Sequence, residues 1–448
     1  MTPGSGRPKG FVVSAPSSAC GKTVLTLGIL RGLKNRGHRV RSAKSGPDYI
    51  DPRFHEAASG TVSFNLDGFA MGRARIGQLA STGEENLVVV EGAMGLFDGA
   101  PPDGRGSTAD VAAFLGLPVV LVVNAGHMSH SVAAIVEGFR RFREDVAVVA
   151  VILNRVGSAR HGAMLRRALE PFGLPVIGAV RRSETLDLPS RHLGLVQAGE
   201  HGDMETFIAR AADHVEDHLD LDLLLSLARP LHRHGKAAGL PPLGQKVAIA
   251  ADRAFSFIYQ HWLEDWRSAG CELTFFSPLA DEAPAGDSDA VFLPGGYPEL
   301  HAGRLARAGR FRAAMLRFRG LVYGECGGYM TLGRTLTDES GEVHPMLGML
   351  PVDTSFAERR RHLGYRLIEA EGGLPWSVPL VGHEFHYATT VRAGPAAPLF
   401  RARDAEGNEL EPMGLRAGRV MGSFAHVIDA ADGAGIVASK PGRGQQPS

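Results

Sequence analysis

The sequence has no excess of either charge and no apolar run long enough to cross a membrane. Lys and Arg together number 48, and Asp and Glu also number 48, so the formal net charge is zero. A neutral chain has no general attraction to nucleic acid or to an acidic membrane surface, so any anion-binding site has to be local. The longest apolar stretch, at 117–123, is far shorter than the roughly 20 residues that span a bilayer. We therefore expect no nucleic-acid partner and no membrane segment.

The sequence is also poor in cysteine, and its three cysteines, Cys20, Cys271 and Cys326, lie far apart. Three scattered cysteines are too few for a disulfide framework or a zinc cluster, which suits a reducing compartment. The apolar run near the N-terminus is interrupted by polar residues too early for a secretory signal. These observations favour a cytoplasmic protein with individual thiols available for chemistry.

Two domains are expected from the length, because 448 residues exceed what one hydrophobic core usually supports. The first half alternates short β-branched runs with helical patterns, which predicts an α/β fold with a doubly wound parallel sheet covered on both faces. A Pro-, Gly- and His-rich stretch then precedes a second α/β pattern. The sequence predicts a first domain at 1–218, a linker at 219–244, a second domain at 245–440 and a flexible tail at 441–448.

The sequence PSSACGKT follows the predicted strand GFVVSA and leads directly into a predicted helix. In such a loop the backbone N–H groups and the ammonium of Lys22 hold a polyphosphate, and the hydroxyl of Thr23 reaches Mg²⁺. We therefore predict an ATP site that includes Ser17, Gly21, Lys22 and Thr23. Because Pro16 stands where the usual pattern has glycine, the strand–loop–helix context supports much of this prediction.

A partition-type ATPase shares this variant loop and sheet, but it depends on an additional lysine near the start of the loop. The chain has Ser17 and Ser18 there. The missing lysine argues against a dimerising regulatory ATPase.

Acidic residues follow two further predicted strands, in the sequences KSGPDYID and EGAMGLFD. Carboxylates beside a triphosphate repel it unless a divalent cation lies between them, so Asp48, Asp51, Glu91 and Asp98 are candidate Mg²⁺ ligands or neighbours of such ligands. Lys44 offers a positive charge to the transferred phosphoryl group or to a substrate carboxylate. The simpler interpretation is that Asp48 and Asp51 cap a loop, and the gathering of acidic strand ends in one sheet outweighs it. The predicted metal ligands are Thr23, Asp48 and Glu91.

A sharp strand-to-helix turn is predicted at GECGGY in the second half, with Cys326 at its apex. Glycines on both sides permit a strained backbone, and the start of the next helix lowers the thiol pKa and supplies N–H donors. Cys326 is therefore a predicted nucleophile rather than a buried structural cysteine. The backbone N–H groups of Gly296, in LPGGYPEL, and of Gly327 are candidate oxyanion donors. His426, after the strand GRV, is the best-placed base.

These motifs resemble those of class I glutamine amidotransferases fused to a dethiobiotin-synthetase-like ATP domain, the corrinoid amidase family of cobalamin biosynthesis. Within that family the chain is similar to the a,c-diamide synthases over nearly its whole length. The resemblance rests on the segments KSGPDYIDPRFH, NLDGF, VVEGAMGLFDG, RHLGLVQAGEH, LPGGYPELHA, YGECGGYM, TSFAERRRHLGYR and GHEFHY.

The resemblance implies an N-terminal P-loop domain and a C-terminal class I glutamine amidotransferase α/β domain, with ATP and glutamine as co-substrates and Mg²⁺ as cofactor. ATP would phosphorylate a peripheral acetate carboxylate of a corrin ring, and ammonia would displace phosphate from the acyl phosphate. The ammonia would come from glutamine, attacked by Cys326 with His426 as base, and would travel inside the protein. Two carboxylates, a and c, would be amidated in turn.

The chain departs from the usual class I pattern after His426. Two residues later, where a Glu normally completes a triad, the chain has Ile428, and Asp429 follows. The resemblance therefore transfers only a Cys–His pair to this chain. The ending GSFAHVID is similar to the branch that acts on the cobalt-free ring, hydrogenobyrinic acid, which implies the aerobic pathway.

A substrate with many carboxylates requires a local basic surface in spite of the zero net charge. The basic candidates are Arg53, His55, Arg191, His192, the run Arg359–Arg361 and His362. The residues predicted to contact the substrate or the transferred phosphoryl group are Lys44, Asp51, Asp98, Arg191 and His192. His383 and His386 have metal-like spacing only on a helix, so a role in the glutamine pocket or in the core is preferred.

Two alternatives share this machinery: the same reaction on cobalt-containing cobyrinic acid, and a cobyric acid synthase that amidates four other side chains. A regulatory ATPase without amidase activity would show an altered elbow or base, whereas Cys326 and His426 are both present. The expected partners are the corrin substrate, ATP and glutamine, with a second copy of the chain as a further candidate.

Overall fold

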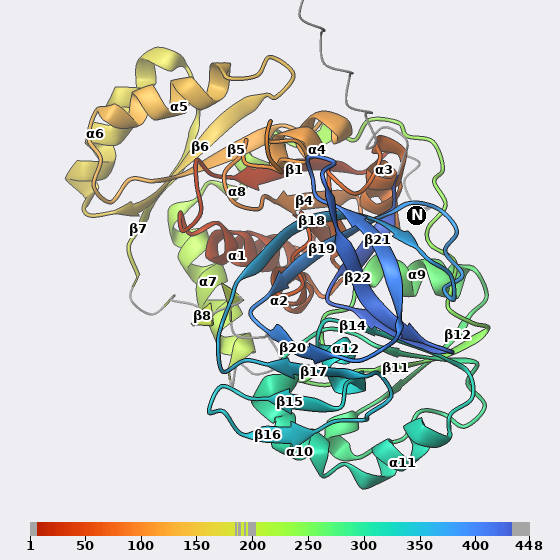
Figure 1. The fold of residues 1–448 in the computed structure, drawn as a ribbon. Helices are drawn as coiled ribbons and strands as arrows, with labels where there is room; N and C mark the ends of the chain where they lie inside the picture. Colours follow the sequence, from red (N-terminus) through yellow and green to blue (C-terminus); the bar gives the residue numbers. More distant parts are fainter. Residues whose placement is uncertain (1–6, 184–185, 187–189, 192–193, 196–202, 432–448) are drawn as a thin grey trace, which may run out of the picture.

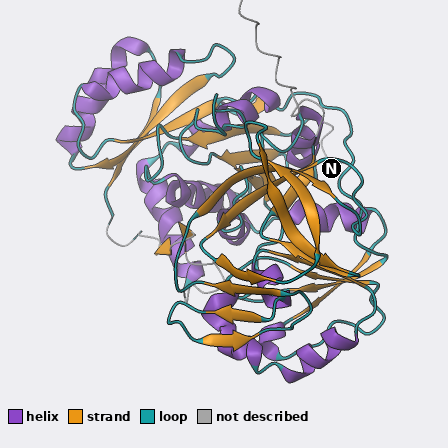
Figure 2. Ribbon diagram, viewed as in Figure 1, coloured by secondary structure: helices purple, strands orange, loops and turns teal. Residues whose placement is uncertain are grey.

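The structure is a computed structural model that describes residues 7–183, 186, 190–191, 194–195 and 203–431 (Figure 1). Within these residues the chain forms two large sheets, one in each half, with helices packed against them. Figure 2 shows that the first half alternates helices and strands, whereas the second half is richer in strands. Among the described residues no helix is both long and apolar enough to span a bilayer.

The first sheet has the strand order β3-β2-β4-β1-β5-β6-β7, and all neighbours on this path run parallel. Successive positions of β1 face different cores: Phe11 and Val13 pack with α1, α7 and α8, while Val12 packs with α3 and α4. Helices therefore cover both faces, and the predicted doubly wound parallel sheet is confirmed. After β1 the chain adds β2, β3 and β4 on one side of it, and then β5, β6 and β7 on the other. The carboxyl ends of the central strands therefore form a switch point, where such sheets bind ligands.

The described strands of the first half are β1 (Lys9–Ser14), β2 (Val40–Ser45), β3 (Phe64–Leu66), β4 (Leu87–Glu91), β5 (Val119–Asn124), β6 (Val148–Val156), β7 (Val176–Arg181), β8 (Ser190–Arg191), β9 (Gly194–Leu195) and β10 (Arg229–Pro230). Its helices are α1 (Lys22–Asn35), α2 (Asp51–Ser59), α3 (Arg73–Ser81), α4 (Thr108–Leu115), α5 (Ser131–Arg141), α6 (Ala159–Leu169), α7 (Met204–His218) and α8 (Leu221–Ser226). A 3₁₀ turn at Glu170–Phe172 completes the described elements of this half.

The second sheet has the order β12-β11-β13-β14-β23-β22-β21-β18-β19-β24. The strands from β12 to β23 run parallel, and the remaining neighbours are antiparallel. The sheet therefore bends back from its parallel part, so that β24 returns toward the first half of the chain. A smaller sheet, in the order β16-β15-β17-β20, packs beside it.

The described strands of the second half are β11 (Lys246–Ala250), β12 (Glu272–Phe276), β13 (Ala290–Leu293), β14 (Leu321–Glu325), β15 (Thr335–Thr337), β16 (Val343–Pro345), β17 (Val352–Ser355), β18 (His362–Ala370), β19 (Leu380–His386), β20 (Thr389–Ala393), β21 (Ala397–Arg403), β22 (Glu409–Ala417), β23 (Val420–Ser423) and β24 (His426–Ala430). Its helices are α9 (Gln260–Ser268), α10 (Ala302–Ala306), α11 (Gly309–Arg317) and α12 (Gly327–Leu332).

The connection between the halves begins later than the predicted linker at 219–244. Helix α8 packs into the core of the first sheet, and β10 pairs antiparallel with β1. The stretch at 231–245 then contains neither helix nor strand. The first half therefore extends to about residue 230, because the apolar side chains of α8 complete its core.

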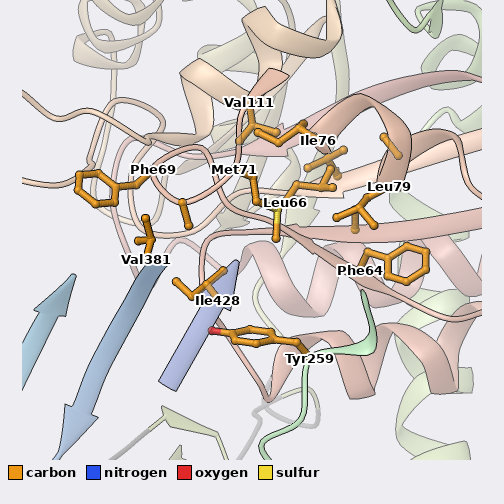
Figure 3. Close-up of a cluster of buried hydrophobic side chains, with 14 of the residues drawn as sticks. Phe64, Leu66, Phe69, Met71, Ile76, Leu79, Val111, Tyr259, Val381 and Ile428 are labelled. Atoms are coloured by element: carbon orange, nitrogen blue, oxygen red, sulfur yellow. The ribbon is translucent and has the colours of Figure 1, made fainter. Parts of the chain in front are cut away.

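One of the hydrophobic clusters contains side chains from both halves. Figure 3 shows Phe64, Leu66 and Phe69 of the first half beside Tyr259 and Ile428 of the second. All of these side chains are buried. This continuous apolar contact fixes the two halves against each other, so side chains of one half can contact side chains of the other at fixed positions.

Candidate functional site

The loop between β1 and α1 is held against β6. Gly21 adopts φ +86°, and a Cβ atom there would lie 2.3 Å from Nδ2 of Asn154, so only glycine fits. The same Nδ2 donates a hydrogen bond to the carbonyl oxygen of Cys20 at 2.8 Å. The sequence analysis missed Asn154, although its place near the carboxyl end of an apolar strand is the signal that marks ligand-facing residues in such sheets.

Lys22 begins α1, and its side chain folds back over the loop. Its Nζ donates hydrogen bonds to the carbonyl oxygens of Ser17, at 3.2 Å, and of Met94. Burial and the nearby charge of Lys44 lower the pKa of Lys22. The loop after β4 thus meets the predicted phosphate loop at this ammonium.

Glu91 ends β4 and is fully buried, and it binds side chains from three other elements. Its Oε1 accepts hydrogen bonds from Oγ1 of Thr23 at 2.8 Å and from Nζ of Lys44 at 2.9 Å. Its Oε2 lies 2.6 Å from Nε2 of His55. Lys44 also donates to Asp51. His55, a sequence candidate for a substrate contact, is instead buried against Glu91.

The charges of this cluster shift one another's pKa values. Burial opposes the charged form of Lys44, but Asp51 and Glu91 outweigh it and raise the pKa of Lys44. Burial likewise opposes ionisation of Glu91, but Lys44 and His55 lower the pKa of Glu91 overall. Burial and the charge of Asp48 raise the pKa of Asp51 to about 6. Lys44 and Glu91 are therefore charged at neutral pH, and Asp51 titrates just below it.

Asp48 and Asp98 each use one carboxylate oxygen to hold a turn. Oδ1 of Asp48 accepts hydrogen bonds from the N–H groups of Ile50, at 2.8 Å, and of Asp51, at 3.0 Å. Oδ2 of Asp98 accepts one from the N–H of Gly95 at 2.8 Å. The loop-capping interpretation is therefore correct for Asp48, and this role uses only Oδ1. Asp51 instead pairs with Lys44.

Two of the basic candidates, Arg53 and Arg359, each pair with a carboxylate of their own half. Arg53 pairs with Glu56 on the same face of α2, at 2.9 Å. The backbone of Arg191 lies in β8, but its side chain is not described, and His192 lies outside the described residues. Arg359 pairs with Glu339 of the second half.

A cavity of about 280 Å³ lies where the start of β18 meets the end of β19. Its lining includes Arg360, His362, Glu384, His386 and Phe424. His386 stacks on Phe424 with the ring centroids 4.1 Å apart. Phe424 also meets Tyr329 of α12 edge to face, with the ring centroids 5.2 Å apart, so the cavity lies beside the helix that follows Cys326. A space of this size suits an amino acid rather than a corrin ring.

Cys326 forms the predicted elbow between β14 and α12. Its φ of +45° is a strained conformation for a non-glycine residue, and its N–H donates to the carbonyl oxygen of Ser423 at 2.8 Å. A Cβ atom at Gly328 would lie 1.8 Å from the carbonyl oxygen of Leu293, so the elbow requires glycine two residues after the cysteine. Burial and the charge of Glu299 raise the thiol pKa, and the Gly327 N–H offsets this only in part. The predicted lowering of the thiol pKa is therefore wrong, because burial outweighs the start of a short helix.

The Gly295–Gly296 turn lies between the elbow and His426. A Cβ atom at Gly295 would lie 2.2 Å from Cε1 of His426, and one at Gly327 would lie 3.0 Å from the backbone nitrogen of Gly296. The turn therefore touches the predicted base on one side and the elbow on the other. Four residues predicted from three separate segments, Gly296, Cys326, Gly327 and His426, are brought together here.

Glu325 was missed by the sequence analysis, although it directly precedes the nucleophile in GECGG. Its Oε1 accepts hydrogen bonds from the hydroxyl of Tyr323 and from the N–H of Val427, both at 3.0 Å. Its Oε2 lies 3.7 Å from Nδ1 of His426. A carboxylate therefore faces the imidazole from the elbow itself.

Tyr49 connects the two sites, because its backbone belongs to the acidic loop and its ring reaches the second half. The ring centroid lies 5.1 Å from that of His426, 5.1 Å from that of Phe257 and 4.3 Å from that of Tyr259. Asp48 and Asp51 flank Tyr49 in the sequence. Through Tyr49, the loop that carries these two carboxylates thus contacts the ring of the predicted base.

Comparison with known proteins matches both halves. The first half fits the CobQ/CobB/MinD/ParA nucleotide binding domain family at 11–196, and the second fits the CobB/CobQ-like glutamine amidotransferase domain family at 246–433. A hydrogenobyrinate a,c-diamide synthase of Brucella anthropi is 56% identical over 430 residues, covering 94% of this chain and 98% of the relative. The proteins of that name from Brucella suis and Rhizobium meliloti are 58% and 53% identical, each over 94% of this chain and over 98% and 99% of their own lengths.

Proposed function

The chain belongs to the family of the hydrogenobyrinate a,c-diamide synthases, and on this premise we propose that it amidates the a and c acetate carboxylates of hydrogenobyrinate, using ATP and glutamine. One observation on the fold supports this proposal above the others. Tyr49, from the loop that carries Asp48 and Asp51, places its ring 5.1 Å from that of His426, so the acidic loop of the first half contacts the proposed base of the second. A synthase that transfers ammonia from one centre to another requires such an approach.

In the first half, the phosphate loop would hold the ATP phosphates through its N–H groups, including those of Ser17 and Gly21, and through Lys22. The substrate carboxylate would attack the γ-phosphorus, so that ADP leaves and an acyl phosphate forms. Lys44 would hold the carboxylate or the transferred phosphoryl group, because its charge is buried and fixed by Asp51. Asp98 would support the loop that carries Met94 against Lys22.

The same cluster fits a divalent cation by its chemistry. Its candidate ligands are the hydroxyl of Thr23 and the carboxylates of Asp48 and Glu91, an all-oxygen set of the kind that Mg²⁺ prefers. When bound, Mg²⁺ would neutralise phosphate charge. Thr23 already touches Glu91 at 2.8 Å, so these two ligands are preorganised.

In the second half, His426 would take the proton of the Cys326 thiol, and the thiolate would attack the side-chain carbonyl carbon of glutamine. The N–H groups of Gly296 and Gly327 would stabilise the oxyanion of the tetrahedral intermediate. His426 would return its proton to the leaving nitrogen, which departs as ammonia. Water would then hydrolyse the thioester and release glutamate.

The test of the proposal is incubation of the purified chain with Mg-ATP, glutamine labelled with ¹⁵N in its amide, and either hydrogenobyrinic or cobyrinic acid. Mass spectrometry is expected to find two labelled amides on hydrogenobyrinate. A diamide formed only from cobyrinate would move the substrate to the cobalt-containing ring. If neither ring gains an amide, the proposed function is wrong.

A second measurement separates the two halves. Cys326→Ala is expected to stop the use of glutamine while ammonium salts still support amidation. The matched control is Cys271→Ala, because Cys271 is also a buried free thiol but lies at the start of β12, away from both sites. We also propose a cytoplasmic location and a homodimer, and light scattering on the 47.6 kDa chain would test the dimer.

A further inference from the structure

The imidazole of His426 has a buried Nδ1 atom without a hydrogen-bond partner among the described residues. Among the described residues, the carboxylate oxygen that faces this Nδ1 is Oε2 of Glu325, at 3.7 Å, within the range of an ion pair. Both side chains are almost completely buried, at 3% and 2% exposure. In a buried site an unpaired polar atom is costly, so this Nδ1 and this carboxylate favour each other.

In other class I amidotransferases a third catalytic group follows the histidine by two residues. In this chain Ile428 occupies that position and Asp429 comes next, and both make other contacts. Ile428 is apolar, and its carbonyl oxygen accepts hydrogen bonds from His261 and Trp262. The carboxylate of Asp429 accepts a hydrogen bond from Arg75 of the first half, at 2.7 Å. Neither residue therefore supplies a carboxylate to His426.

We propose that Glu325 is the residue that positions and polarises His426, in the place of the missing third member of the triad. This inference rests on the proposed function, because it assumes that His426 is the base for Cys326. The two roles of the carboxylate are divided between its oxygens. Oε1 holds the backbone through Val427, next to His426, and Oε2 faces the ring.

The physical reason is tautomer selection. The negative charge of Oε2, 3.7 Å from Nδ1, favours the tautomer with its proton on Nδ1, so that Nε2 keeps the lone pair that takes the thiol proton. The negative charge also stabilises the imidazolium that forms when the proton moves from sulfur to Nε2. Because burial raises the pKa of the Cys326 thiol, this proton transfer needs such support.

In the part of the chain that the structure describes, the other groups that contact the ring carry no competing charge. His383 pairs with His426 across β19 and β24, and burial together with the charge of His426 lowers the pKa of His383 to about 3, so it is neutral. Tyr49 and Phe257 present aromatic rings, and Gly295 presents backbone. Glu325 is therefore the anion that the imidazole meets directly.

The test compares Glu325→Gln with Glu325→Asp in glutamine hydrolysis by the full chain. Gln keeps the volume and loses the charge, whereas Asp keeps the charge and loses one methylene. If the charge acts on His426, Asp should retain more activity than Gln, and Gln should lower kcat by about 10²-fold or more. A role in packing alone predicts the opposite order. The control is Tyr323→Phe, which removes the other side-chain partner of Oε1 and is expected to stay within about fivefold of the native rate.

The pH profile gives a readout that packing does not move. Without the carboxylate the imidazolium is disfavoured, so the acid limb of kcat/KM for glutamine hydrolysis is expected to shift to lower pH by about one unit in Glu325→Gln. Amidation from ammonium salts should remain at the native rate in the same variant. An unshifted profile with equal losses in Glu325→Gln and Tyr323→Phe would overturn the inference. Failure of the native chain to hydrolyse glutamine would instead overturn the proposed function.

Discussion

Arg75 of α3 donates a hydrogen bond through Nε to Oδ2 of Asp429 at 2.7 Å, and so ties the first half of the chain to the strand that carries His426. The same guanidinium also binds the carboxylate of Asp265 on α9. Arg75 is almost completely buried, and its two partners lie on different elements of the second half, α9 and β24. The interface between the halves therefore bears directly on the position of His426, the proposed base.

Arg75→Met is expected to weaken this interface. Removing one partner leaves the carboxylates of Asp265 and Asp429 buried without their cation, which costs about 3–5 kcal/mol for such groups. Urea unfolding should show the loss, and glutamine-dependent amidation should fall more than glutamine hydrolysis. Arg36→Met is the control, because Arg36 pairs with the exposed Asp222 and such a pair contributes at most about 1 kcal/mol. Equal stability of the two variants would contradict this account.

Tyr49→Ala is expected to uncouple the two reactions. Loss of the ring opens the space between His426 and the acidic loop, so ammonia escapes into water before it meets the acyl phosphate. The ratio of glutamate released to amide formed should rise from near one to several, while amidation from ammonium salts continues. Tyr49→Phe keeps the ring and should keep the ratio near one. A ratio that stays near one in Tyr49→Ala would place the ammonia path elsewhere.

Lys22→Met is expected to abolish ATP-dependent amidation with either nitrogen source. The methionine keeps the apolar stem but cannot bind phosphate, a loss of about 10²-fold or more. Glutamine hydrolysis should continue, since Cys326 lies in the other half. Lys34→Met, on the exposed end of the same helix, is the matched control and should amidate normally. Measured ADP release from both variants distinguishes these outcomes.

The stability of the interface should depend on pH through Asp67. Its Oδ2 accepts a hydrogen bond from the hydroxyl of Tyr365 at 2.9 Å. Burial raises the pKa of Asp67 to about 6, from 3.8. The folded chain thus holds this proton more tightly than the unfolded chain, so the stabilisation is full below pH 3.8 and is lost as the pH rises through 6.

Between pH 5 and 7.5 this loss amounts to about 1 kcal/mol. Asp67→Asn does not ionise and should lack this part of the pH dependence. The measurement is the free energy of unfolding in urea at both pH values for the native chain and the variant. Parallel changes in both proteins would show that other groups, such as Asp51, are responsible.

Much of both sites is visible in local sequence. The phosphate loop at Gly21 and Lys22 and the elbow at Cys326 are recognisable because their chemistry depends on backbone conformation, which short runs of glycine and the flanking strand and helix patterns specify. The parallel sheet of the first half is likewise a local matter, since its strands are continuous apolar runs. The structure confirms the sheet and the elbow.

Other features are not visible in this way because they depend on contacts between distant segments. His55 was a surface candidate in the sequence, but tertiary packing buries it against Glu91. Burial also reverses the expected pKa shift of the Cys326 thiol, and no sequence pattern measures desolvation. The hydrogen bond from Asn154 to the carbonyl oxygen of Cys20 likewise forms only because β6 packs beside the loop between β1 and α1.

The sequence by itself determined the two α/β halves, and it predicted the phosphate loop and the pair of Cys326 and His426 as nucleophile and base, because each lies in a contiguous motif. Only the tertiary structure decided which carboxylate faces His426, which residue stands between the two sites, and where the halves join. These relationships connect Glu325 with His426, Tyr49 with Phe257, and Arg75 with Asp429. Such pairs form because folding brings separate strands and loops into one buried volume, where an unpaired charge or an unfilled space is costly.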